Sequence, residues 1–155
     1  IMSRSSQPHR ITMHETQGCL VVPIQEELSQ GAAQSIQQQI LNRIQAKPVR
    51  GVVIDLAGVQ IIDSALWTIF INTTRMIEVM GVPSVLTGLN PGAVASIIDL
   101  QLDCDAIVTA MHLEDALQIL TQNLHAATEA DSGAWEQLDA DAASAMTTSL
   151  TSLET

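Results

Sequence analysis

Aromatic residues are almost missing from this 155-residue chain, which has no Tyr, one Phe and two Trp. Single-stranded nucleic acids are usually held by stacking on exposed aromatic side chains, and nucleic-acid sites in general need clusters of Lys and Arg. Here six Lys and Arg stand against 17 Asp and Glu, for a formal net charge of −11. The composition argues against nucleic acid or an anionic membrane as a partner, and it predicts an aliphatic core.

Cysteine is scarce as well. Cys19 and Cys104 lie far apart, without CxxC or Cys/His spacing, so both are expected to be reduced and buried rather than joined in a disulfide or bound to metal. No apolar run approaches the ~18 residues that a membrane helix needs, and residues 1–10 lack the apolar stretch of a signal peptide. We therefore expect a cytoplasmic protein that does not enter a membrane.

Patterns typical of catalysis or cofactor binding are also absent. The sequence contains no GxGxxG, no GxxxxGK[ST] and no GxSxG, and its four His form no HxxxH or HxxEH pair. Asp99, Asp103 and Asp105 bracket a short loop, but they lack the Gly and the closing Glu of a calcium loop. The chain is expected to be no enzyme and to carry no metal and no cofactor.

What the sequence does contain is an alternation of strand and helix patterns. Pro23 has no N–H to donate, so its strand is expected to lie at a sheet edge or to end there. The patterns predict an α/β domain with a mixed, mostly parallel sheet flanked by about four helices. The expected strands are residues 11–16, 19–24, 52–56, 83–87 and 106–109, and the expected helices lie between Ser29 and Pro48 and over residues 64–80, 91–98 and 112–124.

The composition divides the chain into three parts. Residues 1–10 are polar and expected to be flexible, residues 11–125 form the predicted domain, and residues 126–155 are called the acidic segment below. The acidic segment has six acidic residues and no Lys or Arg. Two interpretations stay open for it: a solvated, disordered tail, or an amphipathic helix. The second rests on apolar residues at intervals of three or four, namely Trp135, Leu138, Ala142, Met146, Leu150 and Leu153.

The dipeptide Asp63-Ser64 comes directly after the buried strand VVIDL and its loop, at the predicted start of a helix. Free backbone N–H groups and the helix dipole favour an anion at such a position. A phosphate on Ser64 would add about −1.5 to −2 charges, which would repel a docked partner. The alternative is that Asp63 and Ser64 only cap the helix, as such residues commonly do.

Four segments carry a resemblance to a known family. Over residues 11–124 the chain resembles the STAS domain and, within that family, the RsbS-like stressosome scaffolds. The segments are GCLVVPIQEELSQGAAQSIQQQILNRI (18–44), GVVIDLAGVQIIDSALW (51–67), MGVPSVLTGLNPGAVASIIDLQLD (80–103) and TAMHLEDALQIL (109–120).

The resemblance implies a switch rather than a reaction. In such scaffolds a serine at the helix start, here Ser64 preceded by Asp63, is phosphorylated by an RsbT-like serine kinase, which the unmodified scaffold retains and the modified one releases. RsbR-like sensor paralogues co-assemble with the scaffold into large shells, and Ser96 matches a second phosphorylated position that is Thr in those sensors. The resemblance says nothing about the acidic segment.

Two other functions stay open. A small soluble anti-sigma factor antagonist would have the same fold and phosphoserine but would capture an anti-sigma kinase without assembling. A detached ligand-binding or enzyme domain of flavodoxin-like shape would instead carry a bound nucleotide. The size of the purified particle separates the first alternative from an assembling scaffold, and bound nucleotide would support the second.

Overall fold

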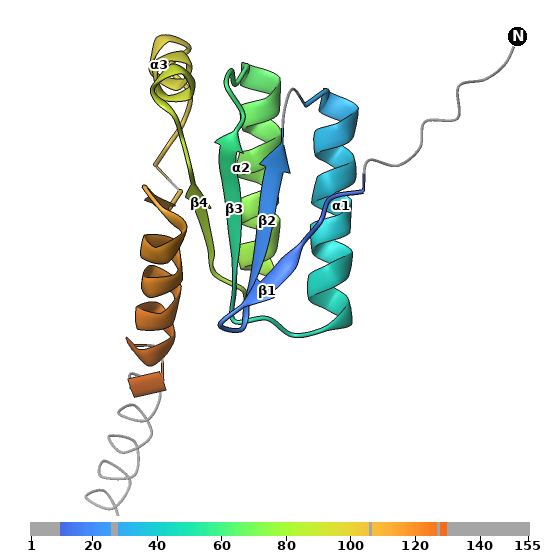
Figure 1. Ribbon diagram of the computed structural model, residues 1–155, viewed down its shortest axis with the longest axis vertical. Helices are drawn as coiled ribbons and strands as arrows, with labels where there is room; N and C mark the ends of the chain where they lie inside the picture. Colours follow the sequence, from blue (N-terminus) through green and yellow to red (C-terminus); the bar gives the residue numbers. More distant parts are fainter. Residues whose placement is uncertain (1–9, 26–27, 106, 127, 130–155) are drawn as a thin grey trace, which may run out of the picture. The chain divides into compact units, whose positions relative to one another are not determined.

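The computed structural model describes residues 10–25, 28–105, 107–126 and 128–129, and it divides into two compact units, residues 1–120 and 121–155. The first unit is built on a five-stranded sheet in the spatial order β1-β2-β3-β4-β5 (Figure 1). The strands are β1 (His14–Thr16), β2 (Cys19–Gln25), β3 (Gly51–Gly58), β4 (Ser84–Thr87) and β5 (Thr109–Ala110). The helices are α1 (Gln30–Ala46), α2 (Ser64–Val79), α3 (Pro91–Asp99) and a further helix over residues 113–126.

Strand direction confirms the mixed, mostly parallel sheet predicted from the sequence. Only β1 runs antiparallel to its neighbour, whereas β2, β3, β4 and β5 are parallel. Helices connect the parallel strands, as this topology requires. The carboxyl ends of β2, β3 and β4 therefore meet at one edge of the sheet, and the loops into α2 and α3 start from that edge.

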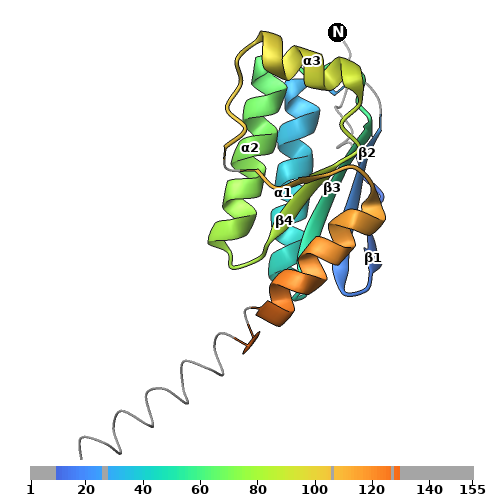
Figure 2. The same cartoon turned by 90° about the vertical axis from the view of Figure 1, so that its left-hand side faces the viewer.

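One face of the sheet is covered by α1 and α2, as Figure 2 shows. Alternate residues of the strands point into this layer, which is aliphatic apart from Trp67 and Phe70. The buried residues of α1 recur at helical spacing, at Ala33, Ile36, Ile40 and Ile44. This is the apolar stripe that the sequence predicted.

The opposite face carries a smaller core under the helix that begins at residue 113. Its members are Cys19, Val21, Val53, Val85, Ala116, Leu117 and Leu120. Gly51 lies directly under Leu120, since a Cβ at position 51 would come within 2.8 Å of the Leu120 methyl groups. Because β3 is covered on both faces, its residues form the continuous apolar run seen in the sequence.

Two helix starts, those of α1 and α3, match their sequence signals. The hydroxyl of Ser29 accepts a hydrogen bond from the Ala32 N–H, and Asn90 caps α3 in the same way through the Ala93 N–H. Pro91 is the first residue of α3, where its missing N–H costs nothing.

Several boundaries differ from the predicted ones. Strand β1 begins at His14 rather than residue 11, because the Ile11 N–H turns toward the Gln39 side chain of α1. Strand β4 begins at Ser84 rather than residue 83. The last strand is Thr109–Ala110 rather than 106–109: residue 106 lies outside the described residues, and the Ile107 N–H bonds to the Cys104 carbonyl in a turn.

Two local predictions also need correction. The strand containing Pro23 does not end there, since β2 continues to Gln25 after a shift in register, and it lies inside the sheet. Strand β1 pairs only with residues 19–21 of β2. On that side, therefore, no β1 carbonyl is paired with Pro23, which has no N–H to donate. Cys104 was expected to be buried, but it is exposed in the turn before β5, whereas Cys19 is buried as predicted.

Most of the acidic segment lies outside the described residues. Residues 126, 128 and 129 are helical, and the predicted apolar stripe from Trp135 to Leu153 falls wholly in the part that is not described. The flexible terminus predicted for residues 1–10 is likewise outside, except for residue 10. Both statements stay predictions.

Candidate functional site

The corner between β3 and α2 presents Asp63 and Ser64 at the carboxyl edge of the sheet. Its loop is held from inside, because the side chains of Val59 and Ile62 are buried and the Val59 N–H bonds to the Leu56 carbonyl at 2.9 Å. A loop fixed at two buried points keeps the residues between and after them in one position.

Asp63 is the residue that caps α2. Its carboxylate Oδ1 accepts a hydrogen bond from the Leu66 N–H at 2.7 Å, and its carbonyl accepts from the Trp67 N–H at 3.0 Å. The capping interpretation left open by the sequence therefore holds for Asp63. It does not hold for Ser64, which is the first residue inside the helix.

Ser64 is left free for other chemistry. It is exposed, and within the described part of the chain its hydroxyl forms no hydrogen bond, while its carbonyl accepts from the Thr68 hydroxyl at 2.8 Å. Of the first N–H groups of α2, only that of Leu66 is bound by the cap, so those of Ser64 and Ala65 lack an acceptor inside the helix. The geometry suits an anion attached at Ser64.

The start of α3 is tied to the same corner by Asn90. The Asn90 side chain accepts from the Ala93 N–H at 2.9 Å through Oδ1, and its Nδ2 donates to the Val59 carbonyl at 2.7 Å. One side chain thus caps α3 and fixes the loop before α2. The sequence did not single out Asn90 beyond its place in a turn.

A groove of about 830 Å³ lies beside Asp63. It is lined by Leu28, Gly58, Val59, Gln60, Ile61, Asp63 and Leu66. Ile61 is 75% exposed although its neighbour Ile62 is completely buried. The loops of this edge, residues 56–63 and 88–92, contain no Lys or Arg, so a negative charge placed here has no basic side chain from these loops to neutralise it.

Ser96, the second phosphorylation candidate, has a different setting. It lies inside α3, is half-buried, and its hydroxyl donates to the Gly92 carbonyl at 3.0 Å. The backbone N–H groups around it are used within the helix, so none is free for a phosphate. The structure does not bring Ser96 to the free end of a helix as it does Ser64.

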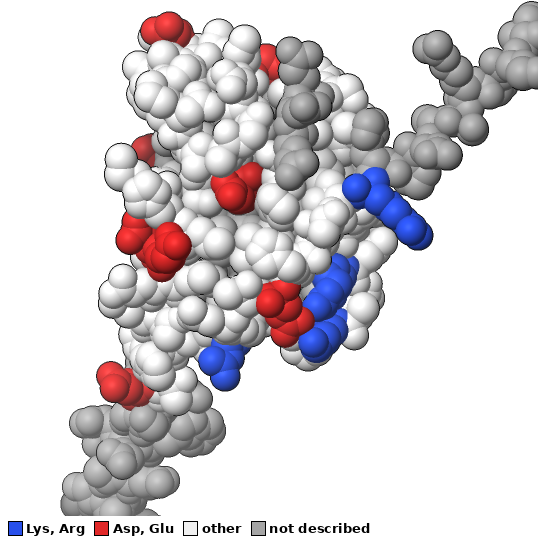
Figure 3. Space-filling model, viewed as in Figure 1, with Lys and Arg blue, Asp and Glu red and all other residues white. Residues whose placement is uncertain are grey.

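Basic side chains gather away from this corner, over the β1 and α1 side in Figure 3. The Glu15 carboxylate pairs with Lys47 at 2.9 Å and with Arg43 at 3.0 Å. The hydrogen bond and the charge of Lys47, followed by the charge of Arg43, hold the pKa of Glu15 below its usual value. These partners lie at the end of α1, opposite in direction to the carboxyl edge of the strands.

The other side chains that could bind metal or react are not assembled into a site in the described part of the chain. Among the described residues, no three His, Cys, Asp or Glu come together as metal ligands. The Asp103 carboxylate accepts from the Asp105 N–H and faces Arg75 at 3.7 Å. Partial desolvation of the otherwise exposed Cys104 thiol, followed by the charges of Asp103 and Asp105, raises its pKa and disfavours the reactive thiolate. No helix of the described part is long and apolar enough to span a membrane.

Comparison with known proteins assigns the fold to a family. The family model of the STAS domain matches residues 10–116. The chain belongs to the STAS-domain family. The resemblance noted in the sequence is thereby confirmed, together with the α/β fold.

Individual relatives narrow the family further. This chain is 27% identical to a serine-to-glutamate variant of RsbS from Moorella thermoacetica, with a TM-score of 0.66 over 75% of this chain and 98% of that one. A subunit from a structure of the stressosome, described as a signal integration and transduction hub, is 26% identical, with a TM-score of 0.62 over 73% and 98%.

A curated relative comes from Bacillus subtilis. Its RsbT co-antagonist protein RsbRA is 24% identical over 98 residues, which make up 63% of this chain and 36% of that protein. The chain thus spans just over a third of the length of this relative. The STAS domain of this chain is therefore similar to RsbS, to a stressosome subunit and to part of RsbRA.

Proposed function

We propose that this chain is a non-catalytic, cytoplasmic scaffold of stress signalling that retains an RsbT-like serine kinase and releases it when Ser64 is phosphorylated. In this proposal it assembles with further copies and with RsbR-like sensor paralogues into a stressosome. The observation that carries the proposal is the exposed hydroxyl of Ser64 at the start of α2, which forms no hydrogen bond among the residues that the structure describes and lies next to a cap that Asp63 already supplies.

The division of labour between the two residues supports a switch. Because Asp63, not Ser64, supplies the cap of α2, modification of the Ser64 hydroxyl removes no hydrogen bond that the described structure contains. A phosphate brings about −1.5 to −2 charges, beside the Asp63 carboxylate and loops without Lys or Arg. The phosphate therefore faces any protein that is docked on this edge. Repulsion from the partner's own negative charges, or the cost of removing water from the phosphate, weakens the contact.

The likeness to RsbS and to a stressosome subunit supports the scaffold role, and the likeness to an RsbT co-antagonist supports the kinase and the paralogues as partners. A small soluble antagonist that captures an anti-sigma kinase is the outcome to distinguish. A particle of megadalton size, alone or with a paralogue, supports the scaffold. A monomer or small dimer at every concentration contradicts assembly.

The direct test is incubation of the full chain with the RsbT-like kinase of the same genome and ATP, followed by phosphosite mapping and by measurement of the bound kinase. We expect one dominant phosphosite, Ser64, and loss of kinase binding in step with its modification. Phosphate on Ser96 alone, or kinase that stays bound to fully modified Ser64, would contradict the proposal.

Ile61 is expected to contribute to kinase binding. An apolar side chain that is 75% exposed on a loop fixed by buried neighbours is the kind of group that forms the centre of an interface. Ile61→Ser should weaken binding of unmodified protein by about tenfold, since ~1.4 kcal/mol corresponds to that factor. The matched control is Ile98→Ser on α3, at a site 67% exposed. Equal affinity of the two variants, measured by titration calorimetry, would remove Ile61 from the interface.

A further inference from the structure

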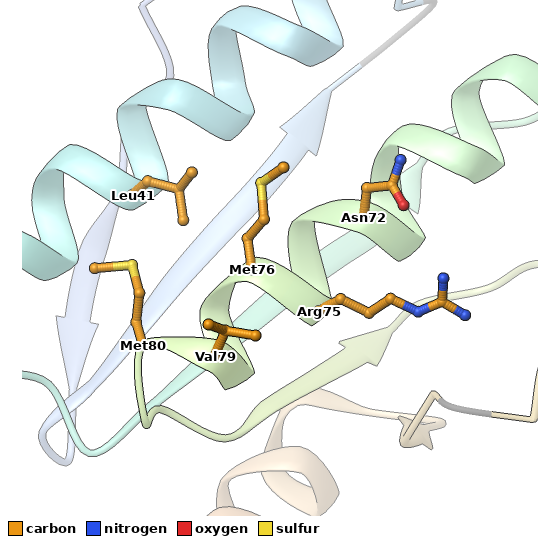
Figure 4. Close-up of a pocket in the computed structure, with 6 residues that line it drawn as sticks. All are labelled: Leu41, Asn72, Arg75, Met76, Val79 and Met80. Carbon is orange, nitrogen blue, oxygen red and sulfur yellow. The ribbon is translucent and has the colours of Figure 1, made fainter.

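A second groove lies away from Ser64, between α1 and the last turns of α2 (Figure 4). It encloses about 390 Å³ and is lined by Leu41, Asn72, Arg75, Met76, Val79 and Met80. Figure 4 shows Met76 on α2 and Met80, the residue directly after α2, extending toward the side of Leu41 on α1, with Arg75 pointing away at the rim. Val79 is 88% exposed, and Met76 and Met80 are each 43% exposed.

The width of this groove is set by a hydrogen bond between α1 and α2. The Gln37 side chain of α1 donates to the Thr73 hydroxyl of α2 at 3.0 Å, and that hydroxyl donates to the Ile69 carbonyl. The bond joins the two helices next to the groove and fixes their separation. Methionine side chains adapt their shape to an apolar ligand, and a groove between two helices is a common seat for an amphipathic segment.

The chain itself carries a segment of matching chemistry. Residues 130–155 lie outside the described residues, and their sequence has the apolar stripe of Trp135, Leu138, Ala142, Met146, Leu150 and Leu153. The other positions include five acidic residues and no Lys or Arg. Such a segment offers apolar groups for the floor of the groove and carboxylates for Arg75, whose side chain is half exposed and whose contact with Asp103 is long, at 3.7 Å.

We propose that the groove formed by Leu41, Met76, Val79 and Met80 binds residues 130–155 of a second copy of this chain. A groove and a matching segment on every copy make a head-to-tail contact, which repeats from copy to copy. The proposal rests on the self-association contained in the proposed function. It adds the surface through which copies of this chain bind one another, and it gives the acidic segment a role.

The test places a photo-crosslinking benzoylphenylalanine at position 79 of the full chain, where the exposed Val79 side chain can be replaced without disturbing the core. Light and heavy isotope-labelled copies are mixed in equal amounts before irradiation. We expect the main product to join position 79 to residues 130–155, and about half of the linked pairs to combine one light and one heavy copy, as random pairing between copies requires.

Matched controls make the outcome decisive. The same crosslinker at position 98, an exposed site on α3, should give little of this product. Met146→Glu in the segment should lower the yield from position 79 by about tenfold, as expected when a central apolar contact is lost. Links found only within one isotope, links to another region, or no links would each overturn the proposal.

The proposed function is read out separately. The same crosslinking protein is tested for phosphorylation of Ser64 and release of the kinase. If the crosslink fails but Ser64 is phosphorylated and the kinase is released, the docking proposal is contradicted and the proposed function stands. If the crosslinks form but Ser64 stays unmodified, the proposed function is contradicted and the docking proposal stands.

Discussion

Ser64→Ala is expected to keep the kinase bound in the presence of ATP, whereas Ser64→Asp should weaken the complex by about tenfold or more, because a carboxylate at the start of α2 places part of the phosphate's charge against the partner. Neither change removes a hydrogen bond of the described structure, since Asp63 supplies the cap. Both variants should therefore unfold at the temperature of the wild type within a few degrees. Co-elution with the kinase, with and without ATP, measures the effect.

The matched control for Ser64→Asp is Thr68→Asp, which adds the same charge one helical turn later on an exposed position of α2. If the effect depends on the helix start, Thr68→Asp should leave the kinase bound. Equal weakening by both variants would indicate nonspecific repulsion by the acidic protein. Wild-type behaviour of Ser64→Ala and Ser64→Asp would remove Ser64 from the switch.

Gly88→Ala is expected to destabilise the domain by about 3 kcal/mol or more. Gly88 follows β4 with φ at +75°, a conformation that costs a non-glycine residue roughly 1–2 kcal/mol. A Cβ there would also lie 2.7 Å from the Ala57 backbone nitrogen. Backbone inside a parallel sheet cannot move aside as a surface side chain can, so the overlap adds to the strain. Denaturant titration of the purified variant gives the free energy of unfolding.

Gly81→Ala is the control that separates strain from overlap. Gly81 has φ at +83°, close to that of Gly88, but no atom lies within 4 Å of a Cβ built there. Its replacement should cost only the conformational term of roughly 1–2 kcal/mol. Equal costs at the two positions would show that the contact between Gly88 and β3 is not tight in solution.

Much of the fold was predictable because the elements on both sides of the sheet leave strong periodic patterns. The stripe of α1 and the continuous apolar run of β3 both follow from which faces are covered. The ends of the edge strands were not predictable in the same way. Residue 11 prefers a hydrogen bond to Gln39, and β5 has only two residues, because contacts distant in sequence decide both.

At the candidate site the sequence located the dipeptide Asp63-Ser64 but did not show which of the two residues caps the helix. Asp and Ser both serve as caps, and only the bond from the Leu66 N–H to Asp63 assigns the cap and leaves Ser64 free. The difference between exposed Ile61 and buried Ile62 is also invisible in the sequence. Two adjacent isoleucines in a loop have no period that tells which of them faces the core.

The two hydrogen bonds of the Asn90 side chain have a consequence for local unfolding of this domain. Because the Asn90 amide joins the first turn of α3 to the Val59 carbonyl in the loop ahead of α2, we expect the opening of that loop and of the start of α3 to be coupled. The two belong to one cooperative unit of local unfolding, with a shared opening free energy. Amide protons at the beginnings of α2 and α3 will therefore exchange with solvent as a pair, and any ligand that stiffens one corner slows exchange at both.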